Sequence, residues 1–247
     1  RVQNVVGNSG VTHAEQGALD QILIGLAHAG QGLACVGAQL QEQQDAAVDD
    51  QLRGQGNDEG MELELSHAEA VDETEGIILT YNGKAAFAVS HLSSCVSTES
   101  GAVVYGEELP YLMPVSVLDE SGFAYYKTQK HLSAEEYQNA FSSYNTSFTA
   151  ENMLGEICFT EGNRVYTIEA GGLCFKGSTF ARLFGLPSTC FTVSKTDNGV
   201  TLICYGNGNG AGMSRLSAVL MAKNGKSYKE ILAHFYTGTL LSHICTE

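Results

Sequence analysis

Hydrophobic positions in the first part of the chain follow a helical period. Leu19, Ile22, Leu23 and Leu26 recur at the i, i+3, i+4, i+7 spacing of an amphipathic helix. The stretch that follows, 41–60, is polar and is interpreted as a connection. We therefore predict a helical N-terminal part with one apolar face.

Beyond this part, short apolar runs alternate with turn residues, which is typical of strands. The runs 77–81 and 85–89 flank Asn82-Gly83, the strongest short-range signal of a β-hairpin. Further strands are predicted at 163–169, 190–195 and 200–205, and helices at 213–223 and 227–236.

The order of these elements favours an α+β fold. Regular strand–helix–strand spacing is missing from the sequence, so we expect mainly antiparallel strands, an N-terminal helix and C-terminal helices. We predict one unit over 1–247, with a helical N-terminal part (1–60) and a mixed α/β body (61–247).

The charge of the chain argues against nucleic acid as a partner. The formal net charge is −15, and residues 1–83 hold only Arg1 and Arg53 as fixed cations before Lys84. Nucleic-acid affinity comes mainly from cations that neutralise phosphates, so we expect no nucleic acid to bind. The acidic run between Glu42 and Glu75 is interpreted as a solvated face.

The seven cysteines form no C-x-x-C pair. Their odd number and irregular spacing predict neither a disulfide framework nor a zinc knuckle. Most are expected to be small buried residues, and for Cys95 a packing role is favoured.

Six short motifs follow one another between residues 70 and 238. They are AVDETEG with ILTY (70–81), HLSSCVSTE (91–99), LPYL with Val115 and Asp119 (109–119), ARLFGLPSTCF (181–191), GNGNGAGMS (206–214) and YKEIL with HFYTG (228–238). In this order they resemble the SpoIID/LytB family, the sporulation protein D type of peptidoglycan lytic transglycosylase. The family's hallmark turn reads G-x-G-H-G-V-G-M-S-Q.

The resemblance implies a function in cell-wall remodelling during sporulation. A member of this family is expected to bind peptidoglycan glycan strands in a long cleft and to cleave the MurNAc–GlcNAc bond, leaving a 1,6-anhydro product. One glutamate suffices as general acid and base, because the MurNAc 6-hydroxyl is the nucleophile. No metal or other cofactor is implied. Such a protein works outside the cytoplasm, membrane-anchored in its full length with the anchor absent from this chain, and other cell-wall hydrolases of the engulfment machinery are possible partners.

The family's catalytic glutamate has no direct equivalent in an ungapped placement. Its position is taken by Ser9, and a serine hydroxyl cannot protonate a glycosidic oxygen at neutral pH. Glu15, six residues further on, is the candidate acid in its place. Two alternatives stay open: a lytic transglycosylase, or an inactive relative that binds glycan or enhances an amidase.

The resemblance also selects the residues expected to contact substrate. They are Ser9, His91, Ser93, Ser94, Thr98, Asn209, Met213, Ser214 and Arg215. Asn209 and Arg215 stand where the family has histidine and glutamine, and His91 is expected either to line the cleft or to be a satisfied surface histidine. Ser9, His91, Asn209 and Ser214 are predicted to converge on one polar, aromatic-poor groove. The stretch 44–54, where some relatives hold zinc, has neither Cys nor His, so no metal is expected.

Overall fold

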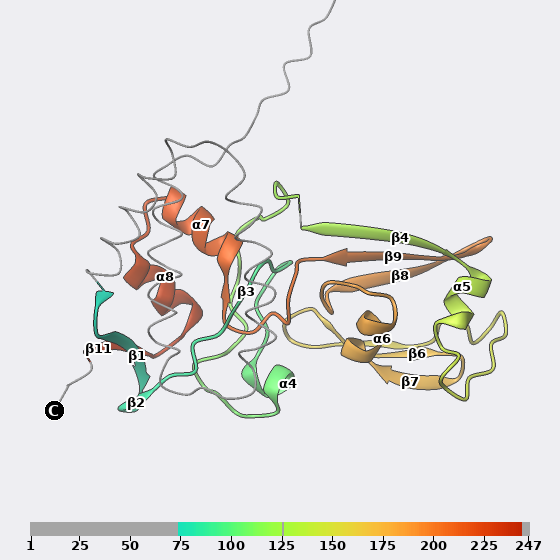
Figure 1. The fold of residues 1–247 in the computed structure, drawn as a ribbon, viewed down its shortest axis with the longest axis horizontal. Helices are drawn as coiled ribbons and strands as arrows, with labels where there is room; N and C mark the ends of the chain where they lie inside the picture. Colours follow the sequence, from blue (N-terminus) through green and yellow to red (C-terminus); the bar gives the residue numbers. More distant parts are fainter. Residues whose placement is uncertain (1–73, 125, 244–247) are drawn as a thin grey trace, which may run out of the picture.

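Short strands and short helices alternate irregularly in the computed structural model, which describes residues 74–124 and 126–243 (Figure 1). The strands are β1 (Ile77–Tyr81), β2 (Lys84–Ala85), β3 (Ser90–His91), β4 (Lys127–Ser133), β5 (Ile157–Phe159), β6 (Val165–Ala170), β7 (Leu173–Lys176), β8 (Phe191–Thr196), β9 (Gly199–Tyr205), β10 (Met213–Ser214) and β11 (Leu240–His243). The helices are α4 (Gly101–Tyr105), α5 (Ala134–Asn139), α6 (Gly177–Leu183), α7 (Arg215–Lys223) and α8 (Tyr228–Phe235). The α+β prediction is confirmed. The predicted helix around Leu19–Leu26 lies outside the described residues, and one unit over 1–247 stays a prediction.

The strands form four small sheets, in the orders β11-β1-β2, β10-β3, β4-β9-β8 and β5-β6-β7. Pairing is antiparallel in all of them except between β3 and β10. The predicted hairpin is present: Asn82 and Gly83 have φ of 50° and 74°, as a turn of the mirror-image type requires. Hairpins of consecutive strands form the pairings β1–β2, β5–β6, β6–β7 and β8–β9, whereas β1–β11, β4–β9 and β3–β10 join distant parts of the chain.

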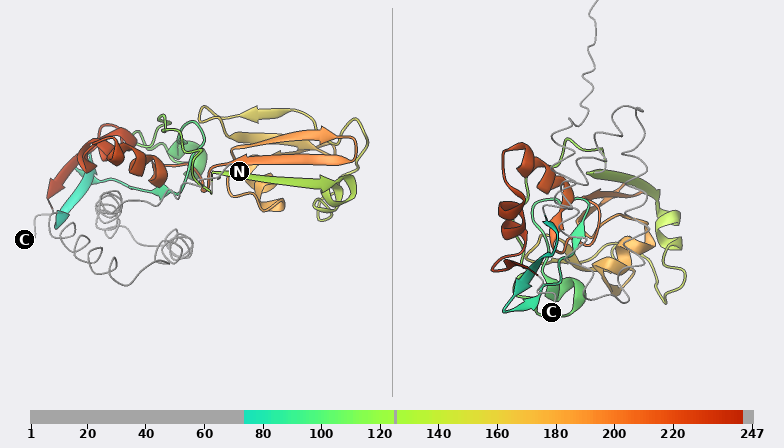
Figure 2. Two further views of the ribbon diagram at one scale, coloured as in Figure 1. Left: turned by 90° about the horizontal axis from the view of Figure 1, so that it is seen from above. Right: turned by 60° about the vertical axis from the view of Figure 1, so that its left-hand side comes forward.

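Aromatic side chains fill one of two hydrophobic cores formed by the described residues. Tyr137 stacks on Phe184 with ring centroids 5.3 Å apart, and Phe141 and Phe180 lie buried beside them. This aromatic core lies among β4, β6, β7, β8, β9, α5 and α6 at one end of the molecule (Figures 1 and 2). Offset and edge-on ring contacts add about 0.5–1.5 kcal/mol per pair beyond the burial of apolar area.

A second core, the helical core, lies at the other end. Its buried members include Leu79, Leu112, Met213, Ile231 and Phe235. They come from β1, β10, α8 and the segment after α4, and α7 covers them as well. β3 and α4 lie between the two ends in Figure 1, and β10 is paired with β3.

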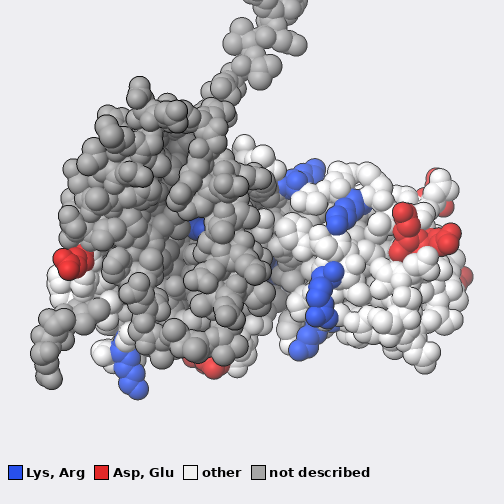
Figure 3. Space-filling model, viewed as in Figure 1, with Lys and Arg blue, Asp and Glu red and all other residues white. Residues whose placement is uncertain are grey.

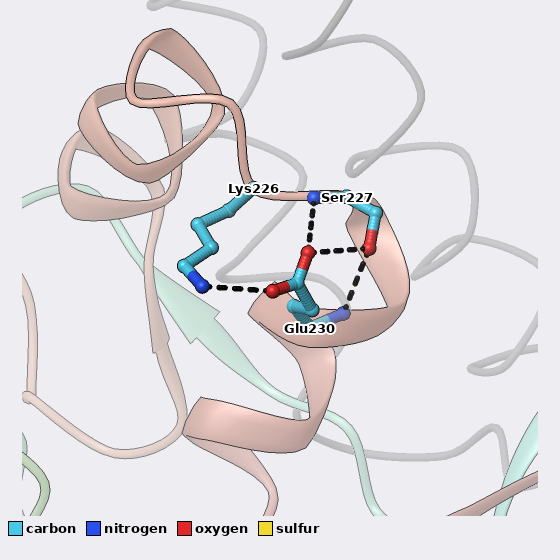
Figure 4. Close-up of polar contacts among 3 residues, drawn as sticks. All are labelled: Lys226, Ser227 and Glu230. Carbon is cyan, nitrogen blue, oxygen red and sulfur yellow. Dashed lines mark hydrogen bonds and ion pairs between the residues drawn. The ribbon is translucent and has the colours of Figure 1, made fainter.

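The start of α8 is fixed by a capping box. The Ser227 hydroxyl accepts from the Glu230 N–H at 3.4 Å, while Glu230 Oε2 accepts from the Ser227 N–H at 2.9 Å (Figure 4). Lys226 adds an exposed ion pair to Glu230 at 2.8 Å. Two otherwise unpaired N–H groups at the helix start are satisfied in this way, and α8 begins one residue after the predicted 227.

Charge is unevenly spread over the face shown in Figure 3. Lys and Arg side chains gather on the part of this face near the start of β4, and Asp and Glu side chains gather at the α5 end, where Glu135 and Glu136 lie in the first helical turn (Figure 3). Among the described residues, no helix has the length and apolar character that crossing a membrane requires.

Candidate functional site

Every second residue of the segment 206–212 is a glycine with positive φ, and we call this segment the glycine turn. The four are Gly206, Gly208, Gly210 and Gly212. A Cβ on Gly212 would lie 1.9 Å from the carbonyl oxygen of Val89, and one on Gly210 would lie 2.3 Å from Arg164 Nε. Neighbouring segments therefore press so closely on the turn that only glycine fits at these positions.

The glycine turn is bound along its length to the segment 91–99. Ser93 and Asn207 exchange both backbone hydrogen bonds, at 3.0 and 2.8 Å, and the Glu99 N–H donates to the Gly210 carbonyl at 2.7 Å. The parallel pairing of β3 with β10 extends this contact. Two of the motifs recognised in the sequence thus form one structural unit.

A buried carboxylate, Glu120, ties this unit together. Its Oε2 accepts from the Ser93 hydroxyl at 2.6 Å and from the Ser94 N–H at 2.9 Å, and its Oε1 accepts from the Ser214 hydroxyl at 2.6 Å. Burial raises the pKa of Glu120, and the serine hydrogen bonds oppose that rise. We call Ser93, Ser94, Glu120, Ser214 and His91 the serine–carboxylate network.

His91 is buried in this network as a neutral imidazole. Its Nδ1 lies 3.1 Å from the Ala211 carbonyl, which can only accept, so Nδ1 carries the proton. Nε2 therefore accepts from the Ser94 hydroxyl, 2.5 Å away. Burial first, and then the charges of Arg164 and Arg215, lower the pKa of His91 to about 3. His91 belongs to the protein interior, not to the surface.

Arg164 brings a second buried charge against the glycine turn. Its guanidinium donates to the Gly208 carbonyl and to the Ser94 hydroxyl, both at 3.3 Å. Glu99, also buried, accepts from the hydroxyl of Thr160 and partly compensates the charge of Arg164. The site thus contains two buried carboxylates and a buried guanidinium.

The hydroxyl of Ser94 and the imidazole of His91 have the geometry of an activated nucleophile. Both side chains are buried, however, and Ser94 has no exposed surface. A nucleophile must reach its substrate, so the pair serves here to hold the segment 91–99 in place.

Asn209 is the exposed side chain at the tip of the glycine turn. Its amide donates to the Tyr105 hydroxyl at 3.2 Å, and its carbonyl accepts from the Ala211 N–H at 3.0 Å. Tyr105 and Phe87 meet edge to face at 5.3 Å and are 37% and 40% exposed. The surface beside Asn209 is therefore aromatic, whereas the sequence predicted an aromatic-poor groove.

The other expected contact residues are buried or half-buried. Thr98 is buried and accepts from the Val115 N–H at 2.9 Å, and Met213 belongs to the helical core. Arg215 is the half-buried first residue of α7, where it has interaction partners. The structure brings His91, Ser93, Ser94, Ser214 and the glycine turn together.

Ser9 and Glu15 lie outside the described residues, so their expected place beside His91 stays a prediction. Conversely, Glu120 and Arg164 belong to the site although the sequence analysis did not select them. Glu120 directly follows Asp119 of the motif at 109–119, but a lone charged residue in a sequence is usually solvated, so neither Glu120 nor Arg164 was singled out. Within residues 74–124 and 126–243, no cluster of three or more His, Cys, Asp or Glu side chains is arranged to hold a metal ion.

The described residues thus define an α+β protein in which a glycine turn is bound to a buried serine–carboxylate network. No family model matches the chain. It is 31% identical over 175 residues to stage II sporulation protein D of Bacillus subtilis, and the aligned stretch covers 70% of the chain and 50% of that protein. The chain is 30% identical over 174 residues to the protein of the same name from Bacillus amyloliquefaciens, with the same coverage of both chains. An uncharacterised protein of Brachyspira hyodysenteriae is 28% identical over 179 residues, 71% of the chain and 48% of that protein.

The chain is a divergent member of the stage II sporulation protein D family. It spans about half the length of the curated relatives that it matches.

Proposed function

We propose that this protein acts in sporulation outside the cytoplasm, where it binds peptidoglycan glycan strands and cleaves the MurNAc–GlcNAc bond as a lytic transglycosylase. The observation that carries the proposal is the rigid union of the glycine turn with the segment 91–99, which presents Asn209 beside Tyr105. Sugar binding needs polar groups and ring faces fixed on a rigid scaffold. Membership in the sporulation protein D family supports the same process.

The buried carboxylates of the site are not suited to be the general acid. Glu120 has no exposed surface and accepts three hydrogen bonds, and Glu99 is 1% exposed. A general acid must reach the glycosidic oxygen directly or through one water. The proposal therefore assigns the acid to the first 73 residues, with Glu15 as the candidate, and assigns substrate positioning to the network.

A second candidate function is favoured by one observation, the serine at position 9. With Ser9 in the family's glutamate position, the protein would grip glycan strands without cleaving them and would act by recruiting or activating another cell-wall hydrolase. The two functions share the same binding surface and differ in the product that is released.

Mass spectrometry of peptidoglycan incubated with the protein separates the two functions. Anhydro-muropeptides that appear with the wild type and disappear with Glu15→Gln support catalysis. Sedimentation with peptidoglycan without new products supports binding alone, and failure to sediment together with no new products refutes both functions.

The binding surface is tested with Asn209→Ala in the same sedimentation assay. Asn139→Ala is the matched control, because Asn139 is an exposed asparagine on α5, which lies away from α4 at the end with the aromatic core (Figure 1). We expect weaker sedimentation for Asn209→Ala alone. Equal binding by the two variants would remove Asn209 from the proposed surface.

A further inference from the structure

Two cysteines from distant parts of the chain meet behind the serine–carboxylate network. Cys95 follows Ser94 and is half-buried, and Cys190 directly precedes β8 and is buried. The two thiols interact, and the Cys190 thiol also donates to the Asn163 carbonyl at 3.7 Å. In this structure both are free thiols.

Contacts of the surrounding chain hold the two cysteines near each other. The Tyr205 N–H donates to the Cys190 carbonyl at 2.8 Å, and the next residue, Gly206, donates to the Tyr126 carbonyl at 2.7 Å. The Tyr126 hydroxyl in turn lies 3.9 Å from Cys95 Sγ. Cys95 and Cys190 are therefore neighbours because the end of β9 packs against the segment 91–99.

The two thiols differ in acidity, as an attacking and a resolving cysteine should. The hydrogen bond from Cys190, followed by that from Tyr126 and by the charge of Arg164, lowers the pKa of Cys95 to about 6 in spite of its burial. The hydrogen bond to Cys95 and burial raise the pKa of Cys190. At neutral pH, Cys95 carries the thiolate that attacks a disulfide.

We infer that Cys95 and Cys190 form a reactive dithiol site that a low-molecular-weight disulfide converts to an intramolecular disulfide. The Cys95 thiolate attacks one sulfur of the small disulfide, forms a mixed disulfide and releases one small thiolate. Cys190 then loses its proton and attacks Cys95 Sγ, which forms the protein disulfide and releases the second small thiolate. Two protein thiols are oxidised and one small disulfide is reduced to two thiols.

The other described cysteines lack this arrangement. Cys158 and Cys174 are exposed on β5 and β7, on opposite sides of β6. Cys204 is buried, its thiol donates to the Ser188 carbonyl at 3.4 Å, and burial raises its pKa. Cys158 and Cys174 are therefore suitable internal controls for exposed thiols, and Cys204 for a buried one.

The test is peptide mapping of the whole chain after reduction, removal of the reductant and incubation with oxidised glutathione. Free thiols are then blocked by alkylation. We expect a cross-linked peptide joining Cys95 to Cys190, and the same link in a Cys158→Ser/Cys174→Ser variant. Cys190→Ser should stop at a glutathione adduct on Cys95.

Two further measurements complete the test. The rate of alkylation of Cys95 in the reduced wild type should reach half its maximum near pH 6, whereas that of Cys158 should rise at higher pH. In urea the specific Cys95–Cys190 link should be replaced by disulfides between various cysteine pairs, because it is the fold that brings Cys95 and Cys190 together. The inference is overturned if native protein forms glutathione adducts on Cys158 and Cys174 but no link between Cys95 and Cys190.

Discussion

Removing the carboxylate of Glu120 should destabilise the fold strongly, and removing only its charge should not. Glu120→Ala leaves the hydroxyls of Ser93 and Ser214 and the N–H of Ser94 buried without their acceptor. A buried hydrogen-bonding group left unsatisfied costs about 1–3 kcal/mol, so three of them give a loss of about 4 kcal/mol after partial relaxation. That is a large fraction of the stability of an ordinary domain.

Glu120→Gln has nearly the same shape and should cost only about 1 kcal/mol. Its carbonyl oxygen still accepts from Ser93 and Ser94, and its amide group donates to the Ser214 hydroxyl oxygen, so that only the Ser214 proton loses its acceptor. The glutamine also avoids the cost of burying a charge, the same cost that raises the pKa of Glu120.

The assay is urea unfolding followed by circular dichroism, with Glu107→Ala as the control because Glu107 is exposed. The midpoint should fall in the order control, Glu120→Gln, Glu120→Ala, with an unchanged slope. A loss below about 1 kcal/mol for Glu120→Ala, or equal losses for alanine and glutamine, would refute the role of this carboxylate as the acceptor that ties the network together.

The pH dependence gives a second check on Glu120. A carboxyl whose pKa is raised by folding binds its proton more tightly in the folded state, so stability decreases as pH rises from its ordinary value of 4.5 through the raised value. The difference between wild type and Glu120→Gln should therefore change in this window, in the direction that favours the glutamine at higher pH. A difference that is constant with pH would contradict the raised pKa.

Three further predictions concern other parts of the fold. The folded pKa of His91 lies below its ordinary value of 6.5, so the free energy of unfolding of the wild type should fall as pH drops from 6.5 towards about 3, by at most about 1.4 kcal/mol per pH unit. In urea titrations at each pH, His91→Gln should remove this slope. Gly212→Ala should prevent folding or cost well over 3 kcal/mol in thermal unfolding. Gly83 has φ of 74° but open space around it, so Gly83→Ala should cost about 1 kcal/mol. Similar losses for the two variants would contradict the steric explanation. Ser227→Ala should cost about 1 kcal/mol through loss of the α8 cap, and Lys226→Ala under about 0.5 kcal/mol because its ion pair is exposed, as chemical unfolding can test.

Local signals in the sequence predicted the local elements. The Asn82-Gly83 turn gave the first hairpin, and the C-terminal helix starts next to the Ser227 cap. The helix predicted at 213–223 begins two residues later, at Arg215. Its first two predicted residues, Met213 and Ser214, pair instead with β3, a long-range contact that no local pattern encodes.

The candidate site depended on distant contacts and was therefore only partly predictable. The motifs pointed to His91 and Ser214, and the structure places these two opposite each other in β3 and β10. Glu120 is bonded to side chains 27 and 94 positions away, and the Arg164 guanidinium reaches Ser94, 70 positions away. Burial and partners at such separations are properties of the fold, so a lone charged residue in the sequence does not disclose them.

The spacing of the glycine turn alternates positions that have no room for a side chain with positions that carry one. At 206, 208, 210 and 212 the surrounding atoms leave no space for a side chain, while the intervening position 209 extends into solvent. Asn209 has room for a different side chain, but the histidine of the family's hallmark turn would have to replace the hydrogen bonds of Asn209 to Tyr105 and to the Ala211 N–H. The four glycines therefore fix the path of the turn, and the chemistry at its exposed tip is set by residue 209 alone among these positions.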